Sequence, residues 1–315
     1  MMSGSRFPPK VRIVEVGPRD GLQNEPESVS LEAKVAFIER LADAGAPIIE
    51  VGSFVRPDRV PQMADTEDVI RRLAPWPGVT YVALVPNFRG LERALASGVR
   101  AIAVFTAASE VFAQANIGMT IDESLDRFRE IVSEAGQHHV SVRGYISTCW
   151  WCPYTGRVDP ESVRRVALAL LEMGCAEIGL GDTIGGATPI EVGELLGQLM
   201  RQIPVEKIAV HFHDTRGTAL ANVLASMEMG IATVDASAGG LGGCPFAPGA
   251  QGNLATEDLL YMLHGMGVET GVDLEKVRAA SRPMEMVLGR RLPSRYLHAG
   301  PLRLSPLPGR SGAPR

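Results

Sequence analysis

Two histidines one residue apart, His211 and His213, carry the clearest chemical signal in this sequence. They end the run KIAVHFH at 207–213, which is typical of a buried strand. Because side chains alternate along a strand, both imidazoles should point to the same side. A lone inward histidine is more often a hydrogen-bonded core residue, but two at this spacing are typical of imidazole pairs that hold a divalent metal together with a carboxylate.

Oxygen donors that would complete such a site come from two distant stretches of chain. Asp20 follows the first apolar run and offers a carboxylate, and Asn253, at the end of a glycine-rich segment, offers an amide oxygen. A mixed set of imidazole and oxygen ligands suits Mg²⁺ or Mn²⁺ and leaves positions open for water or substrate. Zinc-dependent barrel hydrolases also use two histidines at this spacing, but on their first strand rather than the seventh, so they are the weaker alternative.

The segment GGLGGCPFAPGAQGN at 239–253 places Cys244 among six glycines and two prolines. Such a composition cannot hold a helix or a strand, and glycine lets the backbone approach a ligand closely. A small core residue is the alternative interpretation of a cysteine, but its neighbours offer little to pack against. We therefore interpret Cys244 as a reactive thiol on a loop that acts as a lid.

A second cysteine motif, CWWC at 149–152, has the spacing of a redox or zinc motif. A structural zinc site needs a second pair of ligands, which the sequence lacks, and a redox role is the weaker interpretation. We expect the two tryptophans to wall a pocket or to pack on a rim. Four cysteines in 315 residues predict reduced thiols rather than a disulfide framework.

Short β-branched apolar runs alternate with longer amphipathic runs from residue 11 to about residue 266. The longer runs have apolar residues three and four apart, which predicts helices, for example at 31–45 and at 160–174. Eight short runs predict strands, at 11–16, 47–51, 79–85, 101–105, 140–146, 176–180, 207–213 and 232–237.

Eight β-then-α units predict a parallel sheet, and eight is the number that closes as a (β/α)8 TIM barrel. An open doubly wound sheet is the alternative, but its first turn would carry a G-x-G-x-x-G fingerprint that GPRDGLQN at 17–24 lacks. We predict an N-terminal arm at 1–10, a catalytic barrel at 11–270, a helical extension at 271–298 and a flexible tail at 299–315.

Composition and charge argue against several classes of partner. The net charge of −5 and the scattered Lys and Arg leave no basic stripe for a run of phosphates, so we expect no nucleic-acid partner. No uninterrupted run of about 18 apolar residues is present, so we expect no membrane partner. The first ten residues lack the apolar segment of a signal peptide, and we therefore expect a cytoplasmic protein.

Chemistry in a TIM barrel is performed at the carboxyl ends of the strands. Polar residues occupy that end of several predicted strands: Arg19 and Asp20 after the first, Glu50 on the second, Asp182 after the sixth, His211 and His213 on the seventh, and the segment with Cys244 after the eighth. The predicted fold would therefore gather them at one face.

Five segments in this order resemble those of the 3-hydroxy-3-methylglutaryl-CoA lyase family: GPRDGLQNE (17–25), IEVGSFVRPDRVPQMAD (49–65), LGDTIG (180–185), VHFHDTRGTALAN (210–222) and GLGGCPFAPGAQGNLATEDL (240–259). The resemblance implies a divalent-metal-dependent retro-Claisen cleavage, in which a tertiary 3-hydroxyacyl-CoA yields acetyl-CoA and a 3-oxo acid. The oxo acid of the parent reaction is acetoacetate. The partner is then an acyl-CoA, and we expect a homodimer, as in many barrels of this kind.

The resemblance also implies roles for single residues. Metal ligands would be Asp20, His211, His213 and Asn253. Arg19 would stabilise the enolate, His211 would also act as acid or base, and Cys244 would move protons to or from the acetyl carbon. Supporting positions in the binding site would be Gln23, Glu50 and Asp182, and for the two acids an outer, orienting role is the alternative.

One segment departs from the family pattern. WCPYTG at 151–156 stands where the family usually has GCPYEG, so Trp151 and Thr155 replace a small residue and an acid. A longer or branched 3-hydroxyacyl-CoA therefore remains an alternative substrate. A Claisen-type condensing synthase is a further alternative, although such chains usually carry a long C-terminal regulatory domain. A non-catalytic barrel would be expected to have lost metal or cysteine positions, and none is lost.

Overall fold

Eight parallel strands form a closed barrel in the computed structural model, which describes residues 6–243 and 252–302. Around the barrel the order is β1 (Arg12–Glu15), β10 (Thr233–Ala236), β9 (Ile208–Phe212), β8 (Glu177–Asp182), β5 (Ser141–Ser147), β4 (Ala101–Ala107), β3 (Thr80–Leu84) and β2 (Ile48–Ser53). Each predicted strand is present, and no bound differs from its prediction by more than two residues. The predicted TIM barrel is therefore confirmed, and the open doubly wound sheet is excluded.

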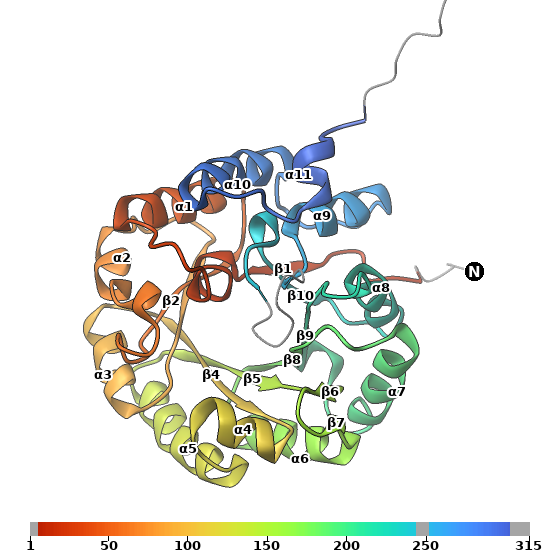
Figure 1. The fold of residues 1–315 in the computed structure, drawn as a ribbon. Coiled ribbons are helices and arrows are strands. Elements are labelled where there is room, and N and C mark those ends of the chain that lie inside the picture. Colours follow the sequence, from red (N-terminus) through yellow and green to blue (C-terminus); the bar gives the residue numbers. More distant parts are fainter. Residues whose placement is uncertain (1–5, 244–251, 303–315) are drawn as a thin grey trace, which may run out of the picture.

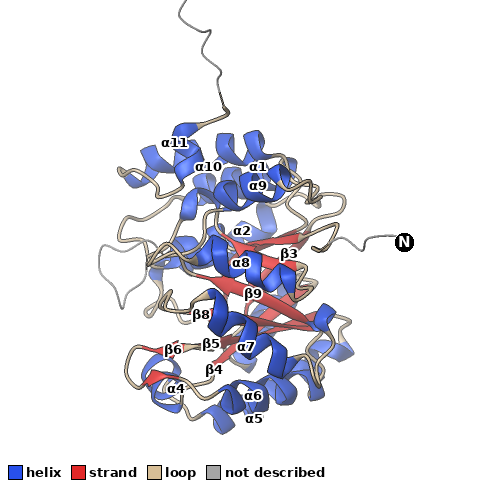
Figure 2. Cartoon of the chain, turned by 90° about the vertical axis from the view of Figure 1, so that its right-hand side faces the viewer, coloured by secondary structure: helices blue, strands red, loops and turns tan. Residues whose placement is uncertain are grey.

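Helices surround this barrel, as the view along its axis shows (Figure 1). They are α1 (Leu31–Asp43), α2 (Thr66–Arg72), α3 (Phe88–Ala96), α4 (Glu110–Ile117), α5 (Ile121–Gln137), α6 (Pro160–Glu172), α7 (Pro189–Leu199), α8 (Ala219–Glu228), α9 (Thr256–Gly265), α10 (Leu274–Leu288) and α11 (Arg295–Ala299). The side view places α10 and α11 at one side of the barrel, together with α1 and α9 (Figure 2). In the described part of the chain, none of these helices combines the length and apolar character needed to cross a bilayer.

Short elements complete the loops. They are η1 (Gly17–Gly21), η2 (Pro61–Met63), η3 (Val205–Lys207), η4 (Ala238–Gly240) and a small antiparallel hairpin of β6 (Trp151–Cys152) and β7 (Gly156–Arg157). Of these, η1 directly follows β1 and carries the Arg-Asp pair at the carboxyl end of the barrel.

Local sequence signals explain where helices begin and end. Helix α6 starts after Asp159, whose side chain accepts a hydrogen bond from the Glu161 amide at 3.0 Å. Pro160 occupies the first turn, where it costs no backbone hydrogen bond. The chain turns away at Gly174, whose φ of +111° favours glycine. The helix predicted for 160–174 is thus confirmed.

The barrel interior has two chemically different halves. Buried apolar side chains, among them Val82 and Leu84 of β3 and Ala103 of β4, fill the interior near β2 to β5. On the opposite side, charged residues pair between strands that are not neighbours in the barrel: Arg12 of β1 with Glu177 of β8, and Arg143 of β5 with Asp235 of β10. Such pairs must cross the interior, so a charged layer lies beneath the carboxyl ends of the strands.

Candidate active site

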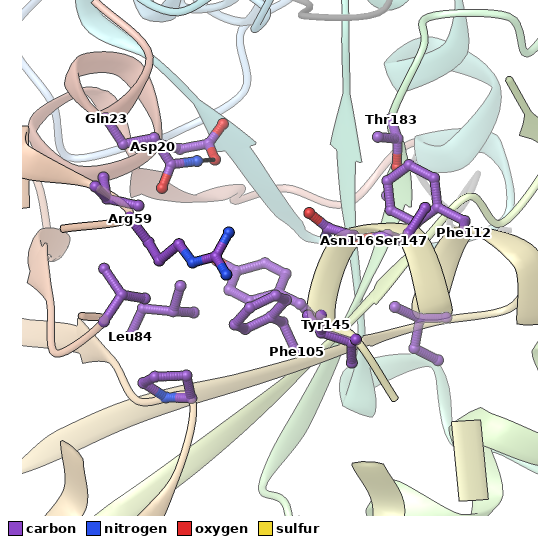
Figure 3. Close-up of a pocket in the computed structure, with 18 of the residues that line it drawn as sticks. Asp20, Gln23, Arg59, Leu84, Phe105, Phe112, Asn116, Tyr145, Ser147 and Thr183 are labelled. Carbon is purple, nitrogen blue, oxygen red and sulfur yellow. Dashed lines mark hydrogen bonds between the residues drawn. The ribbon is translucent and has the colours of Figure 1, made fainter. Parts of the chain in front are cut away.

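A cavity of about 690 Å³ opens where the strands end. Polar residues on its wall include Arg19, Asp20, Gln23, His211 and His213, and apolar ones include Val55, Leu84, Phe105, Phe112 and Ile117. In the close-up, Asp20 and Gln23 lie on one side of the cavity, whereas Phe112 and Asn116 lie across it (Figure 3). A volume of this size accommodates a small-molecule substrate.

Two histidines and one aspartate meet in this cavity. The Nε2 atoms of His211 and His213 are 3.2 Å apart, and Nε2 of His211 is 3.9 Å from Oδ2 of Asp20. In the described residues these three side chains form a group in which one ligand atom of each lies within 4.8 Å of the others. The two histidines point the same way because the extended backbone of β9 continues through His213, which forms an isolated bridge with Asn253. Two imidazole nitrogens directed at the same point suit a shared cation.

Asn253 lies beside this group. Its Nδ2 donates to Oδ2 of Asp20 at 2.8 Å and to the carbonyl of Leu241 at 3.1 Å. Its Oδ1 is buried and has no hydrogen-bond partner in the described part of the chain. Gly242 makes room for this amide: its φ is +109°, and a Cβ there would lie 2.7 Å from Nδ2 of Asn253. A buried, unpartnered amide oxygen fits a fourth metal ligand.

Two acidic residues, Asp20 and the buried Glu50, hold the side chain of Arg19. Its Nε donates to Glu50 at 2.7 Å, and its Nη1 donates to Asp20 at 2.6 Å. The hydroxyl of Tyr145 donates to the other oxygen of Glu50 at 2.8 Å. Glu50 is fully buried on β2, and it therefore fixes the direction of the Arg19 guanidinium at the floor of the cavity.

These contacts set the charges of the site. Burial alone would raise the pKa of Asp20, but Arg19 and the two histidines lower it to about 2. Burial and the neighbouring His211 lower the pKa of His213 to about 4. Burial opposes the charge of Arg19 too, but Glu50 and Asp20 raise its pKa. Near pH 7 the site therefore holds an ionised Asp20 and a neutral His213, the forms that bind metals.

The remaining predicted site residues lie in different places. Gln23 lines the cavity and donates to Oδ1 of Asp20 at 3.0 Å, as Figure 3 shows. Asp182 is buried and accepts hydrogen bonds from the amides of Gly186 and Ala187, and it is not among the residues that line the cavity. Cys244 lies outside the described residues.

The alternation of side chains along β8 explains the position of Asp182. Glu177, four residues before Gly181, points into the barrel, where it pairs with Arg143. Side chains alternate, so Gly179 and Gly181 share this inward face and Asp182 takes the opposite one. The bare inward face is necessary, because a Cβ on Gly179 would lie 2.7 Å from the Tyr145 ring.

The two tryptophans of the CWWC segment pack outside the cavity. Trp150 is buried, donates from Nε1 to the carbonyl of Glu191 at 3.2 Å and contacts the ring of Phe212. Trp151 packs against Gly186. Neither tryptophan lines the cavity, and Cys149 and Cys152 are free thiols. Of the two positions predicted for the tryptophans, packing at the rim is the one observed.

Three buried residues beneath the site escaped the sequence analysis: Arg143 and Tyr145 on β5, and Asp235 on β10. Oδ2 of Asp235 lies 3.2 Å from Nδ1 of His211, and Arg143 donates to Oδ1 of Asp235 at 2.7 Å. The signal that could have identified Arg143 and Asp235 is a charged residue inside a strand that is otherwise apolar, because such a charge needs a buried partner.

Comparisons with known proteins agree with this architecture. The family model described as HMGL-like matches residues 10–284. A 3-hydroxy-3-isohexenylglutaryl-CoA/hydroxymethylglutaryl-CoA lyase of Pseudomonas aeruginosa is 51% identical over 93% of this chain and 98% of its own. The mitochondrial hydroxymethylglutaryl-CoA lyase of Bos taurus is 50% identical over 93% of this chain and 90% of its own.

A solved structure extends the likeness to three dimensions. The HMG-CoA lyase of Bacillus subtilis superimposes with a TM-score of 0.92 at 47% identity, covering 93% of this chain and 98% of that one. The likeness of fold therefore extends over nearly all of this chain, and the residues that the family model matches include the whole barrel.

Proposed function

The chain belongs to the HMGL-like family, and from this premise we propose that it cleaves 3-hydroxy-3-methylglutaryl-CoA to acetyl-CoA and acetoacetate. It is a carbon–carbon lyase, as its relatives are. The observation that carries the proposal is the meeting of Arg19, Asp20 and His211 in one cavity. In this reaction the tertiary hydroxyl loses a proton, the bond between C2 and C3 breaks, and the acetyl-CoA half leaves as an enolate.

The proposed ligands of a divalent cation are Asp20, His211, His213 and Asn253. When bound, Mg²⁺ or Mn²⁺ would lower the pKa of the substrate hydroxyl and offset its negative charge. The support is the 3.2 Å approach of the two Nε2 atoms and the unpartnered Oδ1 of Asn253. The cation's identity is part of the proposal.

Arg19 is proposed to stabilise the enolate. Its guanidinium is already oriented by Glu50 and Asp20 before substrate binds. A fixed cation stabilises the charge that develops on the thioester oxygen better than mobile water does, because no reorganisation is needed during the reaction. Tyr145 supports this orientation by hydrogen bonding to Glu50.

Proton delivery to carbon is assigned to Cys244. The resemblance also implied an acid–base role for His211, but its Nε2 faces the proposed metal site and its Nδ1 faces Asp235, so the hydroxyl proton is proposed to pass to solvent in the cavity instead. Cys244, which lies outside the described residues, is proposed to deliver a proton to the acetyl carbon after cleavage. Gln23 is proposed to hold Asp20 in place, and Asp182 to shape the loop after β8.

A longer or branched acyl group is the second candidate substrate. One relative is named for both isohexenylglutaryl-CoA and hydroxymethylglutaryl-CoA. The cavity of this chain also has an apolar wall, with Leu84, Phe105 and Ile117 among its residues. Such a wall would bury an alkyl branch at C3.

A cleavage assay over 3-hydroxy-3-alkylglutaryl-CoA thioesters, from methyl to isohexenyl, tests both candidates. We expect the methyl compound to give acetyl-CoA and acetoacetate in equal amounts. Faster cleavage of the long-branched compound would favour the second candidate. No cleavage of any thioester by folded, metal-loaded protein would refute the lyase assignment.

Removal of the metal is expected to abolish turnover. After EDTA treatment and gel filtration in a thiol reductant, activity should fall to background and return with Mg²⁺ or Mn²⁺, because the ligands themselves remain intact. Omitting the reductant during storage should cause a separate loss that metal does not restore, as expected for a reactive thiol. Full turnover in the chelated protein would contradict the metal assignment.

Two further predictions from the sequence accompany this proposal. We expect a homodimer and a location in the cytoplasm. Sedimentation of the purified protein and fractionation of cells would measure them.

A further inference from the structure

Asp235 lies next to the proposed metal ligand His211 because of strand register. In the parallel pairing of β10 with β9, Asp235 is the partner of His211, and both side chains point into the barrel. Asp235 is 1% exposed, and its Oδ2 lies 3.2 Å from Nδ1 of His211. The other ring nitrogen, Nε2, lies toward Asp20 and His213.

The carboxylate of Asp235 divides its two oxygens between two partners. Oδ1 accepts from Nη2 of Arg143 at 2.7 Å, and Oδ2 faces the histidine. An arginine and a carboxylate that pair only with each other commonly adopt a two-pronged arrangement. Here Arg143 donates to one oxygen of Asp235, and the other oxygen remains free to accept from His211. This is the arrangement expected if Asp235 orients the histidine ring.

Arg143 is poorly satisfied for a residue that serves stability alone. It is buried, and its Nε and Nη1 have no hydrogen-bond partner in the described part of the chain, although Nε lies 3.3 Å from Glu177. Buried ion pairs often contribute little net stability, because desolvation opposes their attraction. The ion pair of Arg143 and Asp235, with donors that lack partners, lies beneath the proposed metal site. We therefore look to that site, rather than to stability, for its purpose.

We propose that Asp235, anchored by Arg143, is a positioning residue that keeps the proton of His211 on Nδ1 and leaves Nε2 bare toward the metal. The proposal rests on the metal site proposed above. Histidines that bind metals almost always donate their other ring N–H to a carboxylate, carbonyl or water, and loss of that partner typically costs about 10–100-fold in metal affinity or activity.

The tautomer of His211 in the metal-free protein tests the geometry without any substitution. A long-range ¹H–¹⁵N spectrum of the histidine rings, recorded at a pH where the ring is neutral, should show the His211 proton on Nδ1. The signal is identified by its contact with Tyr145, whose ring centroid lies 6.2 Å from that of His211. A proton on Nε2 would overturn the proposal.

Asp235→Asn tests the consequence for metal binding. Arg143 can only donate, so the new amide would turn its oxygen toward Arg143 and its NH₂ toward His211. The proton of the ring would then move to Nε2, and Mn²⁺ affinity, measured by paramagnetic resonance titration, should fall about 10–100-fold. Glu177→Gln is the matched control: it also changes a carboxylate beside Arg143 but does not contact His211, and it should bind Mn²⁺ as the unchanged protein does.

A second substitution separates positioning from damage to the fold. Adding Arg143→Met to Asp235→Asn lets the amide rotate and accept from Nδ1, so Mn²⁺ affinity should partly recover although the barrel loses a further contact. Equal Mn²⁺ affinity of folded Asp235→Asn and the unchanged protein would overturn the inference. If the unchanged protein binds no Mn²⁺, the proposed metal site fails instead, and the tautomer measurement still decides the role of Asp235.

Discussion

Replacing Arg19 by Met should lower kcat at saturating Mn²⁺ by at least about 10²–10³-fold, because loss of one preorganised donor at a developing negative charge has an effect of this size. Arg19 is not a proposed metal ligand, so the cation should stay bound, with an affinity lowered by no more than the about 10–100-fold that loss of an outer partner of Asp20 costs. The measurements are kcat at saturating substrate and an Mn²⁺ titration of the same preparation. Loss of metal together with activity would contradict the assigned role.

The substitution also removes the partner of a buried acid. Glu50 is fully buried and would be left with an unpaired charge, and breaking such a pair can cost about 3–5 kcal/mol of stability. The double variant Arg19→Met/Glu50→Gln removes that charge and keeps an acceptor for Tyr145. It should recover thermal stability but not kcat, which separates catalysis from folding.

A matched control lies in the same cavity. Arg59 lines its wall from an exposed position. Arg59→Met removes the same charge and volume without disturbing Glu50 or Asp20, so kcat should stay close to that of the unchanged protein. A comparable fall in kcat would mean that general positive charge, rather than the oriented Arg19, supports the reaction.

Asp20→Ala and His213→Ala should each abolish turnover by releasing the metal. Both side chains offer a ligand atom to the same point, and loss of a ligand should weaken Mn²⁺ binding by more than the about 10–100-fold that removal of an outer partner costs. Titration with Mn²⁺ measures the affinity, and high Mn²⁺ should restore part of the activity of His213→Ala.

Asp214→Asn provides the control for these variants. Asp214 follows His213 directly, but its carboxylate accepts from the Ala219 amide at 3.1 Å and pairs with Arg295 rather than facing the cavity. The variant should bind Mn²⁺ normally. Equal loss of Mn²⁺ in Asp20→Ala, His213→Ala and Arg19→Met would contradict the division between metal binding and enolate stabilisation.

Local pattern alone predicted the fold. The eight apolar runs and the capped amphipathic segments between them are properties of short windows, and strand and helix formation responds to such windows. The position of Arg19, Asp20, His211 and His213 at one end followed from topology, since parallel strands in a barrel end at a common face. Identity of the family came from motifs at those ends.

The tertiary structure decided which side chains meet inside the barrel. Neighbours such as Asp235 and His211, or Glu177 and Arg143, depend on the register of strands far apart in the chain, which no local pattern specifies. The alternation of side chains along each strand directs Asp182 away from the cavity and places Glu50 beneath Arg19. A sequence names the residues able to carry charge, but only closure of the barrel determines which opposite charge each one faces, because that contact forms across its interior.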